Sequence, residues 1–152
     1  MVQFGAHSEE AAMTSPKMLD PDLQRTVEQE TLTLAVSRIA RYLQDHLGQK
    51  ITAYLSGLDN AKTVGLWISE ESEPRDPAKT RLRYAYQAAR LLIEAYDDET
   101  AKAWFFGCNL LLDDEAPAYL LRHGTTPDHL RLIVPAARKL LESAVPALVE
   151  AP

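Results

Sequence analysis

Apolar residues recur every three or four positions along most of the chain, the spacing that gathers them on one face of an α-helix. The most regular stripe comprises Leu32, Val36, Ile39, Leu43 and Leu47. A second face of the same stretch carries Leu23, Val27 and Leu34. The two faces predict either one helix covered on two sides or a break near Gln29. The regular stripe is expected to lie in the core.

Helix starts and ends are marked by residues that suit those positions. Asp or Thr can cap the first turn, and Pro is tolerated at its first position. Starts are predicted at Asp20-Pro21, Asp76-Pro77, Asp97 or Asp98, Ala116-Pro117 and Thr126-Pro127, and ends at Gly57, Gly107 and Gly124. Pro135 lies inside the last periodic segment and is expected to kink or break it. Because no stretch alternates with the period of a strand, the predicted fold class is all-α, a small helical bundle.

Two short helices meet at Gly57, one over Gln49–Ser56 and a second that Asp59 or Asn60 could cap. Two short helices joined by a tight turn have the shape of a helix-turn-helix. Its second helix enters the major groove of DNA with its N-terminal residues foremost. The candidate DNA contacts are Lys50, Asn60, Lys62, Thr63, Lys79 and Arg83.

Charge weighs against strong DNA binding. The formal net charge is -6. Between residues 57 and 76, five acidic side chains outnumber Lys62 and Arg75. Affinity for DNA depends on Lys and Arg that displace counterions from phosphates. The pair of short helices therefore either binds DNA with support from basic side chains on the next helix, or serves mainly in packing and has a reduced affinity for DNA.

Candidate chemistry is sparse, so we expect no enzymatic activity, cofactor or metal. Cys108, the one cysteine of the sequence, follows Gly107 in an apolar run and is expected to be buried and inert. His123 and His129 lack the spacing of a zinc site. The acidic triple Asp113, Asp114 and Glu115 is expected to be a solvated loop.

The N-terminal residues and the overall hydropathy indicate where in the cell the protein is located. Residues 1–19 are polar and aperiodic and are expected to form a disordered arm, without the apolar run of a signal peptide. No stretch has the length and apolarity needed to span a membrane. With a single cysteine and therefore no internal disulfide, the sequence favours a cytoplasmic protein that does not contact membranes.

Residues in the second half resemble the Xre/MbcA/ParS toxin-binding domain of certain antitoxins. The residues that carry the resemblance are Trp104, Asn109, Leu112, Pro117, Leu121 and Gly124. The first half is similar to the Xre-type helix-turn-helix of the same family. The residues that match there are Leu47-Gly48, Ala53-Tyr54, Gly57, Thr63-Val64, Trp67, Pro74, Arg81-Leu82 and Ala85-Tyr86. The two halves occur in the family's order and together cover residues 32–143.

The resemblance implies an antitoxin of a bacterial type II toxin-antitoxin pair. Its partner would be a RES-domain toxin that destroys NAD, and its C-terminal segment would cover the active-site cleft of that toxin. It would form a homodimer, and its N-terminal half would bind the operator of its own operon. The implied organisation is an arm over residues 1–19, an Xre-like domain over residues 20–96 and a toxin-binding domain over residues 97–152.

The resemblance also assigns roles to residues. Trp104 is expected mainly in the core, Asn109 as a cap after Gly107, Pro117 at a helix start and Gly124 at that helix's end. The expected toxin contacts are Arg122, Arg131, Arg138, Lys139, Leu148 and Val149. The tail after Ser143 is expected either to insert into the toxin or to fray.

The sequence departs from the family pattern at two places. Leu66 and Ser69-Glu70-Glu71 stand where the family has a glycine and a basic residue, which bears on DNA binding, and Cys108 replaces a common Pro. Two alternatives stay open beside the antitoxin. One is a helix-turn-helix transcriptional regulator without a toxin partner, and the other is a helical dimerisation module.

Overall fold

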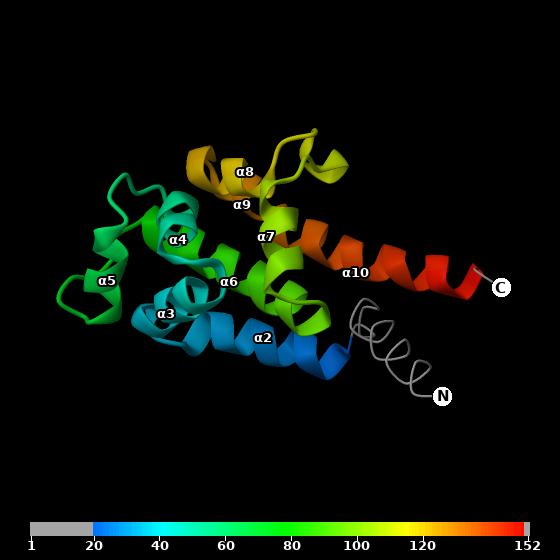
Figure 1. Ribbon diagram of the computed structural model, residues 1–152, viewed down its shortest axis with the longest axis horizontal. Coiled ribbons are helices and arrows are strands. Elements are labelled where there is room, and N and C mark those ends of the chain that lie inside the picture. Colours follow the sequence, from blue (N-terminus) through cyan, green and yellow to red (C-terminus); the bar gives the residue numbers. More distant parts are fainter. Residues whose placement is uncertain (1–19, 151–152) are drawn as a thin grey trace, which may run out of the picture.

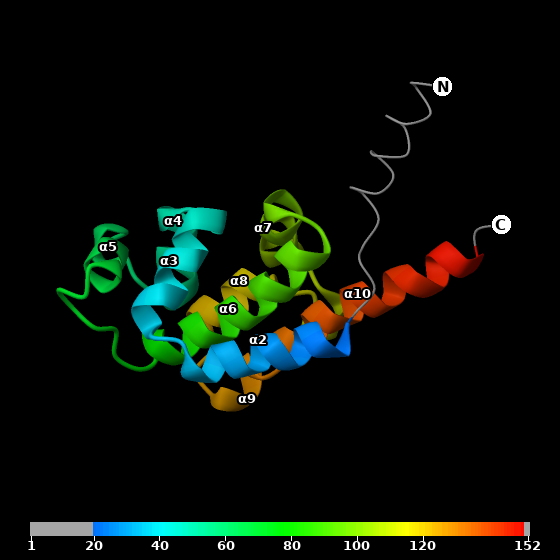
Figure 2. The ribbon, with the colours of Figure 1, turned by 90° about the horizontal axis from the view of Figure 1, so that it is seen from below.

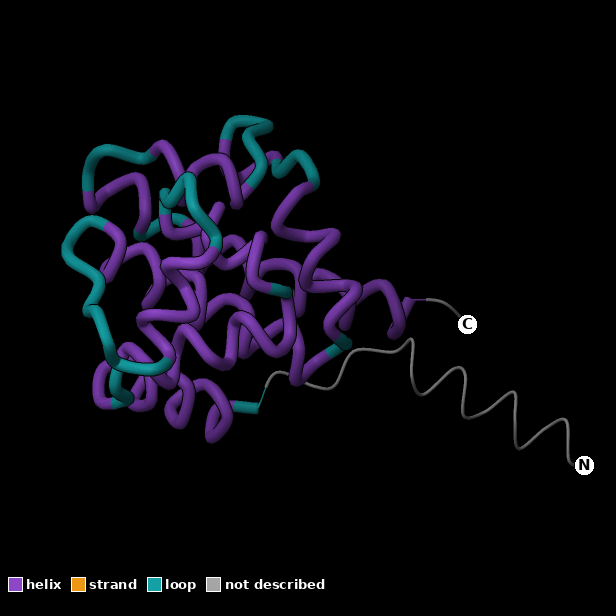
Figure 3. The backbone as a smooth tube through the Cα atoms, turned by 60° about the vertical axis from the view of Figure 1, so that its left-hand side comes forward, coloured by secondary structure: helices purple, strands orange, loops and turns teal. Residues whose placement is uncertain are grey.

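The computed structural model describes residues 20–150, with side chains to residue 142, and every regular element in that range is helical (Figure 3). The elements are α2 Pro21–Thr33, α3 Val36–Leu47, α4 Gln49–Ser56, α5 Lys62–Ile68, α6 Ala78–Ala95, α7 Asp98–Phe106, the 3-10 helix η1 Leu110–Leu112, α8 Pro117–His123, α9 Pro127–Leu130 and α10 Ile133–Glu150. This confirms the all-α prediction. The arm expected over residues 1–19 lies outside the described residues.

Three of the five predicted helix starts are confirmed by hydrogen bonds to the capping side chains, whereas α6 begins one residue later than predicted, at Ala78, and α8 begins at Pro117, both without a side-chain cap. Asp20 accepts from the backbone N–H of Asp22, and Asp97 accepts from that of Thr100. Thr126 caps α9. Local side-chain caps satisfy backbone donors that have no partner within the first helical turn, which is why these starts can be predicted from sequence.

The chain breaks at Leu34 and Ala35, so neither predicted alternative, one helix covered on two sides or a break near Gln29, is correct in position. Both residues have extended backbone angles between α2 and α3. Leu32 is consequently 78% exposed, so its expected place in the core is wrong. Of the regular stripe, Ile39, Leu43 and Leu47 on α3 are buried, and Val36 is half-buried.

Helix α6 runs through the middle of the molecule and contacts α2, α3, α4, α7, α8 and α10 (Figures 1 and 2). The main apolar core forms around it and includes Ile39, Leu82, Phe105, Leu121 and Ile133. A smaller cluster joins α2, α6 and α10 through Val27, Leu91, Val134 and Leu141. Residues on both sides of the predicted boundary at residues 96–97 therefore share one core.

Pro135 led us to predict a kink or a break in the last apolar segment, and the structure has two helices there. Helix α9 ends at Leu130, and α10 begins at Ile133, which places Pro135 in the first turn of α10, where its missing N–H breaks no helical bond. The tail after Ser143 is a continuation of α10 to Glu150, and not the frayed end that was the alternative. In both views this end of α10 extends past the other described helices (Figures 1 and 2).

Candidate functional site

Helices α4 and α5 are the two short helices that were predicted to meet at Gly57, and both pack on α3. Leu55 of α4 and Val64 and Trp67 of α5 are buried. Gly57 ends α4 in the left-handed conformation with a φ of +87°. The side chain of Asn60 then accepts the backbone N–H of Lys62 and fixes the start of α5. The turn is therefore set by local hydrogen bonds and one glycine.

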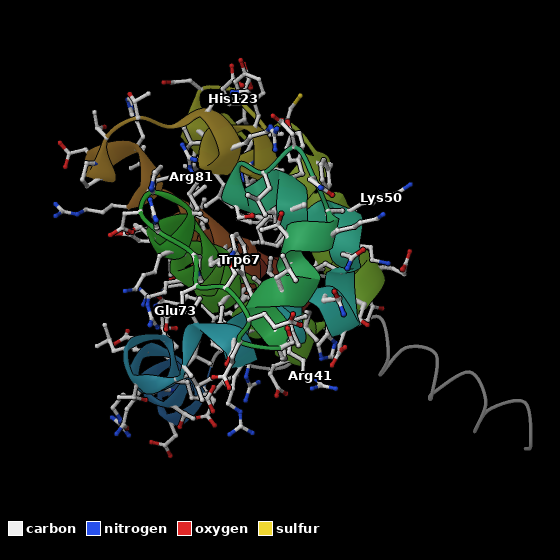
Figure 4. The ribbon with its side chains drawn as sticks, turned by 90° about the vertical axis from the view of Figure 1, so that its left-hand side faces the viewer. Arg41, Lys50, Trp67, Glu73, Arg81 and His123 are labelled. Atoms are coloured by element: carbon white, nitrogen blue, oxygen red, sulfur yellow. The ribbon has the colours of Figure 1, made fainter. Side chains whose placement is uncertain are left out.

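The exposed face of this unit is divided by charge. Lys50, Asn60 and Lys62 are exposed near the start of α5, and Thr63 is half-buried. Glu70 and Glu73 lie beyond its end. Figure 4 shows Lys50 and Glu73 on opposite sides of the face, with Trp67 between them. Only one end of the face has the charge that phosphate contacts require.

The two remaining candidate DNA contacts belong to α6. Lys79 is exposed and lines a hollow together with Glu70 and Glu73. Arg83 donates from its guanidinium to the carbonyl oxygens of Thr31 and Leu34 at the end of α2. Arg83 thus satisfies backbone acceptors at a helix C-terminus, a structural role that sequence reasoning did not foresee.

Arg122 was predicted to contact the toxin, and the structure places it against the α4–α5 turn. Its Nη1 donates to the carbonyl oxygens of Tyr54 at 3.1 Å and Leu58 at 3.0 Å, and its Nη2 lies 2.9 Å from the carboxylate of Asp59. The guanidinium also stacks over the Tyr54 ring, 4.7 Å from the ring centroid. Its side chain is only 18% exposed. Arg122 therefore connects α8 to the end of α4.

A second arginine reaches the same turn from α6. The Nη2 of Arg81 donates to the carbonyl oxygen of Gly124 at 3.2 Å, and a Cβ added to Gly57 would lie 2.5 Å from its Nη1. Burial lowers the pKa of Arg81, and the nearby positive charge of Arg122 lowers that pKa further. The requirement for glycine at position 57 therefore comes from its positive φ, and a side chain there would also displace the end of the flexible Arg81 side chain.

The other predicted toxin contacts are distributed along α9 and α10. Arg131 and Lys139 are exposed, and Arg131 lies 3.5 Å from Asp128. Arg138 forms an ion pair with Glu28 at 2.9 Å and so fastens α10 to α2. Leu148 and Val149 belong to the last turns of α10, and their side chains lie outside the described range.

Of the residues predicted to form a structural frame, Asn109 and Pro117 have the predicted roles, and Trp104 does not. Asn109 accepts the backbone N–H of Leu111 at 3.0 Å, and Pro117 occupies the first position of α8, as predicted. Trp104 is only half-buried, whereas Phe105 is fully buried and takes the core position expected of Trp104. The reason is helical geometry, since Phe105 shares a face with Ala101, four residues earlier, and that face meets the core.

Four large apolar side chains between residues 106 and 119 are exposed. Leu110 is 87% exposed, Leu111 53%, and Phe106 and Tyr119 both 48%. Cys108 in the same segment is also exposed, so its predicted burial is wrong. Sequence reasoning placed this segment inside as a frame. Three consecutive leucines at residues 110–112 were the missed signal, because a single turn cannot bury all three.

The acidic triple is exposed, as expected of a solvated loop. Within the described part of the chain, no group of His, Cys, Asp and Glu side chains is arranged to hold a metal ion. Over the same part, no helix combines the length and apolarity required to cross a bilayer.

The fold therefore defines a small all-α protein in which two short helices join at Gly57 and the C-terminal helix projects past the other described helices. The chain matches no family model, no curated protein and no solved structure. Its function is therefore argued from its own residues and surfaces.

Proposed function

We propose that this protein is the antitoxin of a bacterial type II toxin-antitoxin pair and that, as a homodimer, it binds and blocks a RES-domain toxin that degrades NAD. The observation that carries the proposal is the C-terminal end of α10, which extends past the other described helices (Figure 1). An amphipathic helix that projects from a body is suited to insertion into a groove of a partner.

Further support comes from the composition of the C-terminal segment. Residues 144–149 read Ala-Val-Pro-Ala-Leu-Val and carry no charge, while Arg131 and Lys139 are exposed nearer the body. Apolar anchors with a charged rim are the usual anatomy of a protein interface. The blocking mechanism needs no chemistry from this chain, only an interface that excludes NAD from the cleft.

The proposal is tested by co-expression with the RES-domain toxin whose reading frame it predicts beside this gene. The full-length chain should restore growth and cellular NAD, and a chain that ends at Ser143 should fail to do so. The control replaces residues 144–150 with a Gly/Ser segment of equal length, which keeps the chain length but removes the apolar side chains. Full protection by the chain that ends at Ser143 would refute blocking by the α10 end.

A second candidate function is a DNA-binding regulator, which in the antitoxin would act on its own operator. It is favoured by exposed Lys50, Asn60 and Lys62 around the start of α5. Gel shifts with the DNA upstream of the gene should show binding that weakens steeply between about 50 mM and about 200 mM salt, since phosphate contacts release counterions. Lys50→Ala should reduce the salt slope, whereas Arg131→Ala on α9 should leave it unchanged. DNA binding without any toxin partner would favour the regulator over the antitoxin.

A further inference from the structure

A hollow of about 380 Å³ lies beside the turn between α4 and α5, and its lining includes side chains of α4, of α8 and of the turn itself. Lys50 of α4 and Arg122 of α8 both line it. Tyr54 lies between these two cations, because residues four apart on a helix are neighbours and the Arg122 guanidinium lies over the Tyr54 ring, 4.7 Å from its centroid. The two positive side chains therefore flank one aromatic ring at the wall of the hollow.

The Arg122 guanidinium is anchored through one nitrogen and holds an oxyanion with another. Its Nη1 donates to the backbone carbonyl oxygens of Tyr54 and Leu58, which fixes the guanidinium in place. Its Nη2 donates to the carboxylate of Asp59 at 2.9 Å, and the Asp59 side chain is 100% exposed. An ion pair with so exposed a carboxylate contributes little free energy, because water solvates the carboxylate well. Another oxyanion can therefore replace Asp59 at Nη2 while Nη1 keeps its own bonds.

Positive side chains outnumber their carboxylate partners at this turn, although the whole sequence has a net charge of -6. Asp59 is the carboxylate that pairs with Arg122, and the ion pairs among the described residues include neither Lys50 nor Arg81. Burial lowers the pKa of Arg81, and repulsion from the positive charge of Arg122 lowers that pKa further. A further anion at this turn would therefore be stabilised by positive charge that the chain itself leaves unpaired.

We propose that the hollow is a phosphate-binding site, in which phosphate oxygens replace the Asp59 carboxylate at Nη2 of Arg122 and also accept from Lys50. The phosphate is that of a DNA backbone, because Asn60 and Lys62 follow Asp59 directly and are exposed at the end of the face where positive charge gathers. Contacts of this kind fix the register of a protein on DNA. The inference extends the DNA-binding candidate function and does not depend on the toxin.

The first measurement uses free phosphate as the probe. The isotope-labelled full-length chain is titrated with sodium phosphate at constant ionic strength, and the backbone N–H signals of residues 57–61 should shift and saturate. Lys50→Gln should weaken this binding at least about threefold, since it removes one of the two charged donors. The control is Arg25→Gln, which removes a positive charge at the start of α2, on the far side of the molecule from α4 (Figures 1 and 2). It should change the phosphate affinity by less than about 1.5-fold, because salt screens distant charges.

The second measurement uses DNA and the competing carboxylate. In gel shifts with the duplex upstream of the gene, Asp59→Asn should tighten binding at least about threefold, because it frees Arg122 from an exposed ion pair. The same variant should tighten the binding of free phosphate by a similar factor. Asp22→Asn is the matched control, since it also neutralises an exposed carboxylate paired with an arginine, and it should change either affinity by less than about 1.5-fold. Circular dichroism verifies that the variants are folded.

The outcomes decide the proposal and identify the source of the phosphate. Tighter binding of both DNA and free phosphate by Asp59→Asn supports the proposal as stated. Tighter binding of DNA alone supports a site that accepts phosphate only as part of a strand. Tighter binding of free phosphate by a chain that binds no DNA overturns the DNA assignment. If phosphate causes no saturable shift at millimolar concentrations and Asp59→Asn affects DNA binding no more than Asp22→Asn does, the hollow is not a phosphate site, whatever co-expression with the toxin shows.

Discussion

At the scale of single residues, Arg122 makes contacts of three kinds. It satisfies two carbonyl oxygens at the end of α4, pairs with Asp59 and stacks on Tyr54. A planar guanidinium stacks flat on a ring while its fixed fork of N–H groups serves several acceptors, whereas an ammonium group has neither a flat face nor a fixed fork. Its sequence position beside Gly124 gave no hint of this, because the partners lie more than sixty residues earlier.

Arg122→Ala is expected to lower the free energy of unfolding by about 2 kcal/mol, since it removes the donor to the Leu58 carbonyl and one of the two donors to the Tyr54 carbonyl, which also accepts from the N–H of Gly57. Arg122→Lys should recover only part of this loss. Urea denaturation followed by circular dichroism measures both values.

The control for these variants is Arg131→Ala, whose exposed pair with Asp128 should contribute less than about 0.5 kcal/mol. Equal effects of Arg122→Ala and Arg131→Ala would show that the contacts at the α4–α5 turn contribute little to stability.

At the scale of elements, helix α2 is fastened to α6 by a polar network. The hydroxyl of Tyr86 donates to Glu30 at 2.9 Å, and Arg90 pairs with both Glu30 and Glu94. Burial and the hydrogen bond to Glu30 raise the pKa of Tyr86 to about 12. The folded state therefore holds the Tyr86 proton more tightly than the unfolded chain does.

This raised pKa predicts a loss of stability at alkaline pH. An unfolded tyrosine titrates near about pH 10, so the contribution of Tyr86 is complete below that pH and is lost as the pH rises to about 12. Tyr86→Phe removes the titrating group and keeps the ring, so its stability should decline less steeply over this range. Midpoints of urea unfolding measured from about pH 9 to about pH 12 test this, and parallel declines would contradict it.

Most element boundaries could be predicted because their signals are local. Asp20, Asp97 and Thr126 cap the turns that follow them, and this depends on neighbouring residues alone. The break at Leu34 could not be placed in this way, since its carbonyl and that of Thr31 are satisfied by Arg83, about fifty residues later. The exposure of Leu110 and Leu111 was missed for a related reason. Periodicity marks apolar residues as core and does not identify those that the fold leaves exposed.

At the scale of the whole molecule, the predicted domains share one apolar core. Ile39 and Leu82 from the first half and Phe105, Leu121 and Ile133 from the second half belong to the same buried cluster. The two sequence motifs are thus not two independent folding units. The motifs identify each half, but the packing between the halves depends on contacts that neither motif contains.

The shared core predicts a single cooperative thermal transition. Calorimetric and van't Hoff enthalpies should agree, as they do for one-core domains of this size. A fragment of residues 20–96 should show little helical circular dichroism on its own, because it loses the partners of its apolar face. Two separate transitions in the full chain, or a folded fragment with its own sharp transition, would contradict the prediction.

The contact of Arg122 and Arg81 with one turn has a thermodynamic consequence. Arg122 comes from α8, Arg81 binds Gly124 at the end of α8, and both adjoin the turn that sets α5 relative to α4. Suppose that the affinity of one ligand depends on the position of α8 and the affinity of another depends on the conformation of that turn. The binding of the first ligand is therefore coupled to the binding of the second. Linkage is reciprocal, so a partner that weakens DNA binding by some factor must itself be weakened by DNA by the same factor.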